Sequence, residues 1–121
     1  MVKVLTVDDM EDITFSIEKS LVEIDPTYEV IKVNNGQEAL ELANSTDPDI
    51  ILLDLMMPDM SGWQVLSKLR SNPATKDIPV IIVTAKEDEL SKQMGEQMTD
   101  AYILKPFDGR DIDRKIKSIL S

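Results

Sequence analysis

Cysteine and histidine are both absent from this sequence of 121 residues. Without cysteine there is no disulfide framework and no thiolate metal site. Without histidine there is no imidazole base and no histidine-ligated zinc site. Any chemistry must therefore use carboxylates, hydroxyl groups, lysine side chains and the backbone.

Positive charge and long apolar runs are also scarce. The chain has 13 Lys and Arg against 23 Asp and Glu, which argues against nucleic acid and anionic membrane surfaces as direct partners. No apolar run approaches the roughly 20 residues that span a bilayer, and the segment after Met1 is too short and too quickly acidic for a signal peptide. We therefore expect a cytoplasmic protein. The length suits one domain, residues 1–121, with one core.

Short apolar runs alternate with segments of helical periodicity along the whole chain. The runs predict five strands, at residues 2–7, 28–33, 50–53, 79–83 and 101–104. Spacings of three and four predict five helices, at residues 10–24, 37–44, 61–70, 87–98 and 108–120. The first of these helices is expected to bury one apolar face, made of Ile13, Phe15, Ile17, Leu21, Val22 and Ile24. Five βα units favour an α/β, doubly wound, flavodoxin-like fold with a parallel sheet in strand order 2-1-3-4-5.

Polar residues follow four of the predicted strands. Asp8 and Asp9 follow the first, Asp54 the third, Thr84 the fourth and Lys105 the fifth. In the predicted order these strands are neighbours, so the five residues meet at the edge where open α/β sheets bind ligands. Three carboxylates that repel one another favour a hard divalent cation, and Mg²⁺ fits an all-oxygen site.

This set of residues suits phosphoryl transfer. A cation and a lysine beside Asp54 would neutralise the oxygens of a transferring phosphoryl group, and the carboxylate is a nucleophile that can form an aspartyl phosphate. Taken alone, each residue has a simpler interpretation: Asp8 and Asp9 suit a helix start, Asp54 a turn and Thr84 a strand end. Lys105 suits either a solvated lysine entering a turn or an X-Pro bond held cis. Their coincidence at strand ends favours the phosphoryl site.

Two further features are interpreted as structural. Trp63 is expected to be a partly exposed residue that packs its helix. The segment Asn34-Asn35-Gly36 predicts a turn between the second strand and the second helix.

Together the motifs resemble the receiver domains of two-component response regulators, over the whole length of the chain. Val7-Asp8-Asp9 resembles the acidic pair of that family. Residues 54–62, Asp-Leu-Met-Met-Pro-Asp-Met-Ser-Gly, resemble the phosphoacceptor segment almost residue for residue. Thr84-Ala85 is similar to the switch hydroxyl and its small follower, Tyr102 falls at the switch aromatic, and Lys105-Pro106-Phe107 closes the pattern.

The resemblance implies a phosphoacceptor. Asp54 would accept a phosphoryl group from a phosphohistidine on a sensor histidine kinase or a histidine phosphotransfer protein. Asp9 and Asp54 would bind Mg²⁺ directly, Asp8 would act partly through water, and the backbone carbonyl of Met56 would complete the site. Mn²⁺ is expected to substitute for Mg²⁺.

The resemblance also implies a switch. Lys105 and the hydroxyl of Thr84 would contact the phosphoryl oxygens, Thr84 would move toward them, and Tyr102 would turn inward. The face built from the fourth helix, fifth strand and fifth helix would then control a downstream protein partner or an output domain, with a phosphorylation-dependent dimer as a further expectation. On this interpretation the chain is not an enzyme for outside substrates and catalyses only its own phosphotransfer and dephosphorylation.

The expected fourth helix departs from the family pattern. Met98 stands where a helix-capping glycine is usual, and Gly95 lies inside the helix. The sequence leaves open whether the chain is a single-domain regulator or a receiver cut from a longer chain.

Two other classes of protein share parts of the pattern. A phosphatase of the haloacid dehalogenase type would need a second Asp two residues after Asp54, where Met56 stands. A flavodoxin-like cofactor module would need a loop rich in Ser, Thr or Gly after the first strand. Asp8 and Asp9 stand there instead and would repel a cofactor phosphate.

Overall fold

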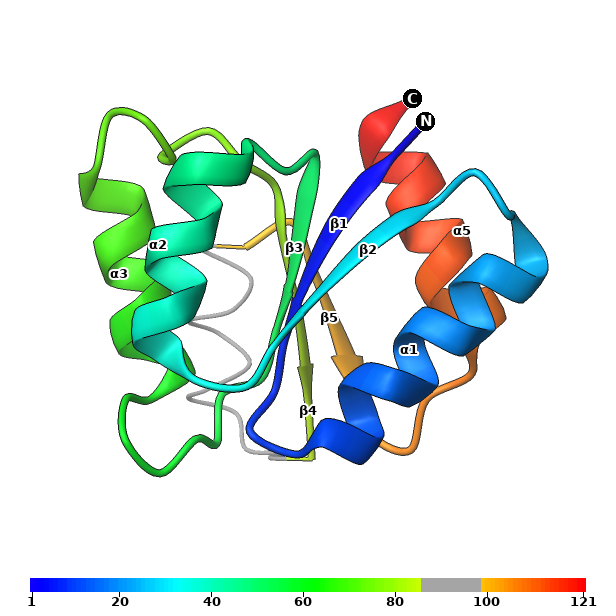
Figure 1. Ribbon diagram of the computed structural model, residues 1–121, viewed down its shortest axis with the longest axis horizontal. Helices are drawn as coiled ribbons and strands as arrows, with labels where there is room; N and C mark the ends of the chain where they lie inside the picture. Colours follow the sequence, from blue (N-terminus) through cyan, green and yellow to red (C-terminus); the bar gives the residue numbers. More distant parts are fainter. Residues whose placement is uncertain (86–98) are drawn as a thin grey trace.

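Five parallel strands form a single sheet in the computed structural model, which describes residues 1–85 and 99–121. Their order is β2-β1-β3-β4-β5, which confirms the predicted topology (Figure 1). Because the strands run in one direction, their carboxyl ends all lie at the same edge of the sheet. The strands are β1 (Lys3–Val7), β2 (Glu29–Val33), β3 (Ile50–Leu53), β4 (Val80–Thr84) and β5 (Ala101–Leu104).

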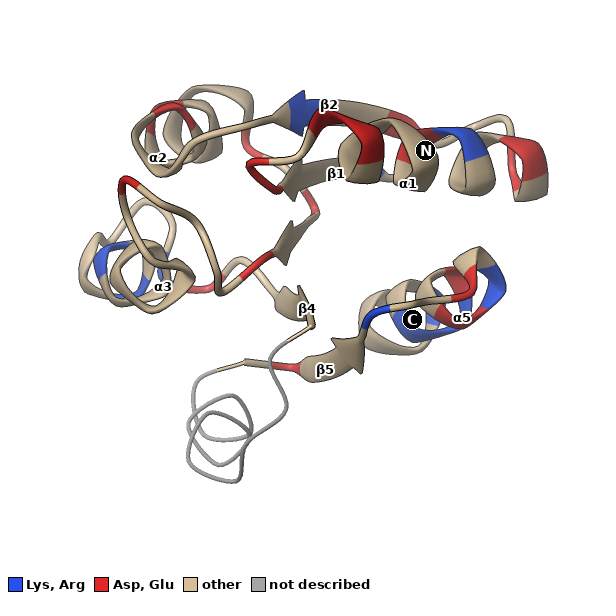
Figure 2. Cartoon of the chain, turned by 90° about the horizontal axis from the view of Figure 1, so that it is seen from below, with Lys and Arg blue, Asp and Glu red and all other residues tan. Residues whose placement is uncertain are grey.

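Helices cover both faces of the sheet, as a doubly wound fold requires (Figures 1 and 2). One face carries α2 (Gly36–Thr46) and α3 (Gly62–Ser71), and the other carries α1 (Glu11–Ile24) and α5 (Gly109–Leu120). The fourth helix, expected at residues 87–98, lies outside the described residues. Among the described helices, none combines the length and the apolar character that a membrane crossing requires.

The central strand β3 is buried on both faces. Ile51 and Leu53 belong to the core beneath α2 and α3, whereas Ile50 and Leu52 belong to the core beneath α1 and α5. Successive side chains of a strand point to opposite faces. A continuous apolar run is therefore what a strand covered by helices on both sides needs.

Side-chain caps fix the first turns of three helices. The carboxamide oxygen of Asn35 accepts a hydrogen bond from the N–H of Glu38 at 2.8 Å at the start of α2. Ser61 and Gln64 form a capping box at the start of α3, and Asp108 caps α5. Because each of these helices follows a strand, the caps also fix the loops at the carboxyl edge of the sheet.

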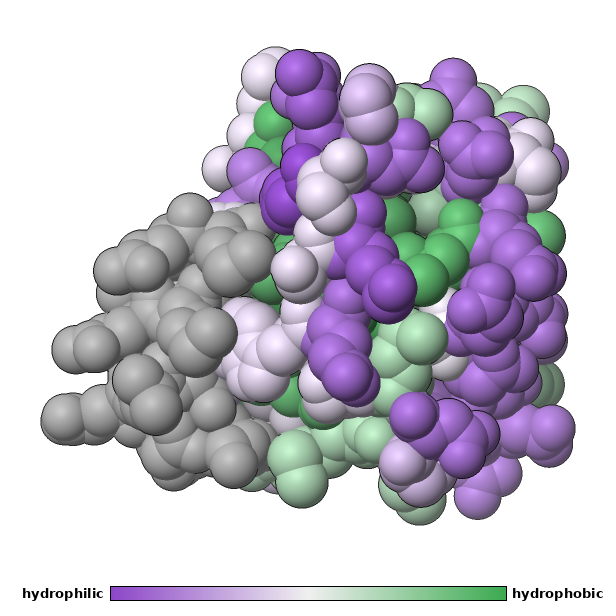
Figure 3. Space-filling view, turned by 90° about the vertical axis from the view of Figure 1, so that its left-hand side faces the viewer, coloured by the Kyte–Doolittle hydropathy of each residue, from purple (hydrophilic) through white to green (hydrophobic). Residues whose placement is uncertain are grey.

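The outward sides of α2 and α3 are mainly hydrophilic. Figure 3 faces these two helices and shows hydrophilic columns with a hydrophobic seam between them. Trp63 of α3 is half-buried and packs against the core. This confirms the expectation that Trp63 is a partly exposed packing residue.

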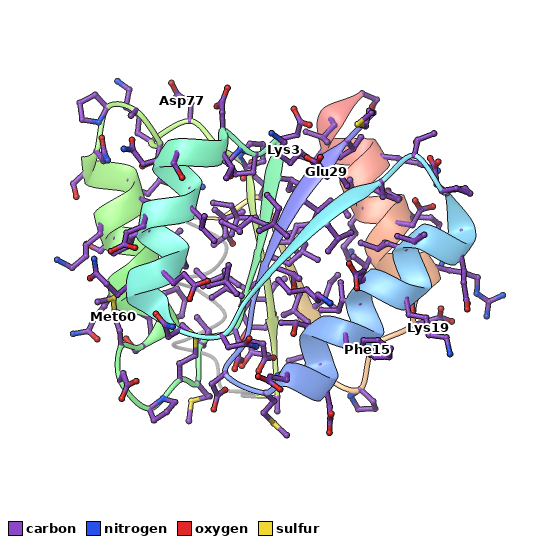
Figure 4. The ribbon with its side chains drawn as sticks, in the orientation of Figure 1. Lys3, Phe15, Lys19, Glu29, Met60 and Asp77 are labelled. Atoms are coloured by element: carbon purple, nitrogen blue, oxygen red, sulfur yellow. The ribbon has the colours of Figure 1, made fainter. Side chains whose placement is uncertain are left out.

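The predicted apolar face of α1 is partly wrong. Ile17 and Leu21 are buried, but Phe15, Val22 and Ile24 are exposed. Each helical residue advances about 100°, so Phe15 lies roughly 200° from Ile17 and points away from the sheet (Figure 4). Residues only two positions apart cannot share one face of a helix.

A buried polar contact fastens α5 to the start of β2. The hydroxyl of Tyr28 donates a hydrogen bond to Oδ1 of Asp113 at 2.6 Å, and Nζ of Lys117 lies 3.2 Å from the same oxygen. Nζ of Lys117 also lies 3.7 Å from Oδ2 of Asp25, which follows α1. Burial, followed by the hydrogen bond to the Asp113 carboxylate, raises the pKa of the Tyr28 phenol above its ordinary value.

The raised pKa of Tyr28 predicts a loss of stability at alkaline pH. The stabilisation from this group is complete below the pKa of an unfolded tyrosine, about 10, and is lost as the pH rises beyond that value. Tyr28→Phe should flatten this alkaline loss. It should also lower the free energy of unfolding at neutral pH by about 1–3 kcal/mol, because the carboxylate of Asp113 loses a donor. Urea unfolding between pH 7 and 11 measures both effects, with Tyr102→Phe as the control that keeps the alkaline loss. Equal alkaline slopes for Tyr28→Phe and the parent protein would contradict the prediction.

Candidate functional site

The five predicted site residues lie together at the carboxyl edge of the sheet. Asp8 and Asp9 directly follow β1, Asp54 directly follows β3, Thr84 is the last residue of β4, and Lys105 directly follows β5. Figure 2 looks onto this edge and shows acidic segments after β1 and β3 and a basic segment after β5. Strand order thus brings residues that are far apart in sequence to one place.

Lys105 is the cation of this group. Its Nζ donates a hydrogen bond to Oδ2 of Asp8 at 2.6 Å and lies 3.7 Å from Oδ1 of Asp54. The other carboxylate oxygen of Asp8, Oδ1, accepts a hydrogen bond from the N–H of Met10 at 3.0 Å. The peptide bond between Lys105 and Pro106 is cis, as one of the simpler interpretations allowed.

The carboxylate of Asp54 is held in an unfavourable environment. The residue is 3% exposed. Burial first, and the nearby Asp8 carboxylate second, raise the pKa of Asp54 above its ordinary value. Lys105, the N–H of Met56 and the hydroxyl of Thr84 act in the opposite direction but do not cancel the effect. The ionised carboxylate is therefore costly here, as expected for a buried charge with incomplete compensation.

The acidic residues present the donor set of a hard cation. Carboxylate oxygens from Asp8, Asp9 and Asp54 lie within 4.8 Å of one another. Oδ1 of Asp54 is buried and has no hydrogen-bond partner among the described residues. Among the described residues, three carboxylates against the ammonium group of Lys105 leave an excess of negative charge. Oxygen ligands and excess negative charge fit Mg²⁺.

The loop after Asp54 is closely packed against the site. The N–H of Gly62 donates a hydrogen bond to the carbonyl of Leu55 at 3.0 Å. A Cβ atom at Gly62 would lie 2.2 Å from the carbonyl oxygen of Asp54, so only glycine fits without moving this backbone. Within the same loop Met56 is exposed and Met57 is buried. The packing of Gly62 therefore helps to set where Asp54 lies.

The remaining predicted residues are less directly connected to the site. The N–H of Met56 is a hydrogen-bond donor to Asp54, and the predicted metal-binding role of its carbonyl stays a prediction. Tyr102 of β5 is half-buried and packs against the core on the side of α2 and α3. Its role as a switch stays a prediction, as do the roles of the other site residues. Gly95 and Met98 lie outside the described residues.

Sequence reasoning missed one contact to the site. The side-chain amide of Asn34 donates a hydrogen bond to the backbone carbonyl of Asp8 at 2.9 Å. The sequence predicts only a turn at Asn34. The available signal was its position directly after β2, at the same edge of the sheet as the acidic residues.

The raised pKa of Asp54 predicts a pH-dependent gain from its removal. The stabilisation from this group is complete below the pKa of an unfolded aspartate, about 4, and is lost as the pH rises through the folded pKa. In a chelator, Asp54→Asn should therefore be more stable than the parent protein at pH 7, and the difference should shrink toward pH 4. Urea unfolding measures this, with the exposed Asp59→Asn as the control. A variant less stable than the parent at pH 7, or a difference independent of pH, would contradict it.

Comparison with known proteins identifies relatives over nearly the whole chain. The family model of the response regulator receiver domain matches residues 4–117. The alkaline phosphatase synthesis transcriptional regulatory protein PhoP of Bacillus subtilis (strain 168) is 36% identical over 119 residues, 98% of this chain and 48% of the relative. The transcriptional regulatory protein SrrA of Staphylococcus aureus is 41% identical over 98% of this chain and 47% of its own length. The chain thus spans about half the length of these curated relatives.

Solved structures resemble the fold closely. The chemotaxis protein CheY4 of Vibrio cholerae has a TM-score of 0.89 and 30% identity, covering 99% of both chains. A receiver domain protein from Methanospirillum hungatei has the same TM-score and identity and covers 99% of this chain and 94% of its own. The family match, together with the strand order and the residues at the carboxyl edge, leads to one conclusion. The chain belongs to the response regulator receiver domains of two-component signal transduction.

Proposed function

We propose that residues 1–121 form a phosphorylation-dependent signalling switch whose phosphoacceptor is Asp54. The donor is the phosphohistidine of a sensor histidine kinase or a histidine phosphotransfer protein, and the reaction requires Mg²⁺ or Mn²⁺. The carrying observation is the carboxylate of Asp54, which is 3% exposed with one oxygen lacking a hydrogen-bond partner among the described residues. A buried nucleophile beside an ammonium group and two further carboxylates suits phosphoryl transfer.

The proposed step is a displacement at phosphorus. An oxygen of the Asp54 carboxylate attacks the phosphorus, the new O–P bond forms, and the N–P bond breaks with its electron pair returning to the imidazole of the donor. The Nζ of Lys105, 3.7 Å from Oδ1 of Asp54, is within reach of a phosphoryl oxygen with a small movement. The hydroxyl of Thr84, already a hydrogen-bond donor to Asp54, can turn to another phosphoryl oxygen. The ammonium group of Lys105 would neutralise negative charge that develops at the transition state, and the hydroxyl of Thr84 would donate a hydrogen bond to it.

The acidic pair and the loop after Asp54 would hold the cation. Asp9 and Asp54 would supply direct carboxylate ligands, Asp8 would act partly through water, and the carbonyl of Met56 would complete the set. A bound Mg²⁺ supplies positive charge for the phosphoryl oxygens. Oδ2 of Asp8 is hydrogen-bonded to Lys105, which supports an indirect role for this carboxylate.

A regulatory role fits the site better than turnover of outside phosphate esters. Met56 stands two residues after Asp54, where a phosphatase of the haloacid dehalogenase type needs an acid. Its exposed thioether has no proton to give to a leaving group. The chain would therefore catalyse its own phosphorylation and dephosphorylation only.

The effect of phosphorylation is proposed to reach a downstream partner through a face made of β5, α5 and the fourth helix. The fourth helix lies outside the described residues. An open groove of about 560 Å³ lies beside the end of β5 and α5, lined by residues that include Leu104, Phe107 and Arg114. Two relatives are named as transcriptional regulators and are about twice as long as this chain. We infer a downstream protein partner or an output domain, and a phosphorylation-dependent dimer, in the cytoplasm and without direct contact of this domain with nucleic acid.

Asp54→Asn tests the phosphoacceptor. Incubation of the parent protein with acetyl phosphate and Mg²⁺ should add the mass of one phosphoryl group, and the variant should gain none, because an amide is not a nucleophile at phosphorus. Intact-mass spectrometry measures the adduct. Asp59→Asn, which alters an exposed residue of the same loop, should be phosphorylated like the parent. A full adduct on Asp54→Asn would refute the assignment.

Hydrogen exchange tests the output face. Phosphorylation should change the protection of residues 99–105 more than that of α2, because Lys105 and Tyr102 lie on the segment connected to the phosphoryl site. Exchange measured by mass spectrometry with and without acetyl phosphate gives the comparison, and Asp54→Asn is the control for effects of the reagent. Equal changes in both segments would mean that the signal does not run through β5.

A further inference from the structure

Asn34 contacts the acidic loop rather than its own turn. Its side-chain Nδ2 donates a hydrogen bond to the backbone carbonyl of Asp8 at 2.9 Å, across 26 residues of sequence. The same nitrogen lies 3.4 Å from the hydroxyl oxygen of Thr14, 20 residues away. A residue needed only for the turn would bond within the turn, as its neighbour Asn35 does with Glu38. Two adjacent residues of one type thus have different tasks.

The contact prolongs the pairing of β1 with β2 beyond the ends of the strands. The last paired residues are Val7 and Val33. The N–H of Asp8 then donates to the carbonyl of Val33 at 3.0 Å, and the amide of Asn34 binds the carbonyl of Asp8. Both backbone groups of Asp8 are therefore fastened to the end of β2.

A fixed carbonyl at Asp8 also fixes the position of the Asp9 backbone. The carbonyl group and the N–H and Cα of the next residue lie in one plane. A hydrogen bond that fixes the carbonyl of Asp8 therefore fixes the plane that carries the Cα of Asp9. On the other side of Asp9, the N–H of Met10 is held by Oδ1 of Asp8 at 3.0 Å. Asp9 thus lies between two anchors, and Asn34 supplies the first.

Asp9 depends on its backbone more than the other two carboxylates do. Asp8 and Asp54 are buried and contact Lys105. Asp9 is exposed, and no hydrogen bond or ion pair from the described residues reaches its carboxylate. Mg²⁺ demands nearly ideal octahedral geometry at about 2.0–2.1 Å, so a small displacement of one ligand weakens binding.

We propose that Asn34 is a positioning residue of the cation site, because its side-chain amide holds the Asp8–Asp9 peptide and thereby sets where the Asp9 carboxylate lies. The proposal rests on the proposed function, in which Asp9 is a direct ligand of Mg²⁺. Asn34 does not touch the cation and acts only through the backbone of Asp8.

Mg²⁺ titration of the 121-residue protein, followed by Trp63 fluorescence and by calorimetry, tests the proposal. Asn34→Ala should raise the Kd for Mg²⁺ about tenfold, the lower end of the effect of residues that orient metal ligands. Asn34→Leu keeps most of the side-chain volume, adds no charge and should raise the Kd similarly. Asn35→Ala removes the cap of α2 and should lower the thermal midpoint while leaving the Kd within about twofold of the parent.

A second measurement separates positioning from a general loss of structure. The rate of phosphorylation by acetyl phosphate is measured against Mg²⁺ concentration. For Asn34→Ala the half-maximal concentration should rise in parallel with the Kd, and the rate at saturating Mg²⁺ should recover to near that of the parent. A damaged fold would lower the rate at every concentration. Circular dichroism verifies folding, and Asn34→Leu decides the matter if Asn34→Ala does not fold.

The outcomes distinguish this proposal from the proposed function. If the parent does not bind Mg²⁺, or Asp9→Ala binds it as tightly as the parent, the metal site itself is wrong. If Asp9→Ala weakens binding but the Asn34 variants bind like the parent, Asn34 has no positioning role and the proposed function stands. If Asn34→Ala and Asn35→Ala weaken binding equally, the effect belongs to the whole turn and the proposal is overturned.

Discussion

The placement of two nearly buried carboxylates beside one ammonium group constrains the rest of this structure. Asp8 and Asp54 are 2% and 3% exposed, and the Nζ of Lys105 contacts both carboxylates. The site opposes folding at Asp54, because burial first and the nearby Asp8 carboxylate second disfavour the ionised state of Asp54 and raise its pKa. The apolar strands and the two cores provide the stabilisation that holds it. The fold thus holds a buried carboxylate that lowers its stability, and the apolar cores offset that loss.

Lys105 connects this constraint to the proposed switch. Its Nζ is 2.6 Å from Asp8 but 3.7 Å from Asp54, so its shorter contact is not with the proposed phosphoacceptor. Under the proposed function, a phosphoryl group on Asp54 would add negative charge near the ammonium group of Lys105. The balance of contacts made by Lys105 would then change, and Lys105 directly follows β5. Under the proposed function, a change of charge at Asp54 would thus reach β5 through Lys105.

The two ends of the sheet have different roles. At the amino edge, Nζ of Lys3 lies 3.7 Å from Glu29 and donates to the carbonyl of Thr46, and these contacts join β1 to β2 and to the end of α2 (Figure 4). On the α1 side, Tyr28 fastens α5 through Asp113. These contacts stabilise the scaffold away from the site. At the carboxyl edge, the loop after Asp54 depends on tight backbone packing. Gly62 lies so close to the carbonyl of Asp54 that a side chain there would clash with it.

The sequence by itself determined the strands, the strand-end positions of Asp8, Asp54, Thr84 and Lys105, and the class of fold. Those features depend on local patterns: a continuous apolar run specifies a strand buried on both faces, and the residue after it lies at the edge. Only the tertiary structure decided which apolar residues of α1 are buried, because Phe15 faces solvent although it is apolar. Tertiary structure also decided the contacts of Lys105 with Asp8, 97 residues away, and of Asn34 with the Asp8 carbonyl. Such contacts depend on how strands that are distant in sequence are arranged in space, and no local periodicity records that arrangement.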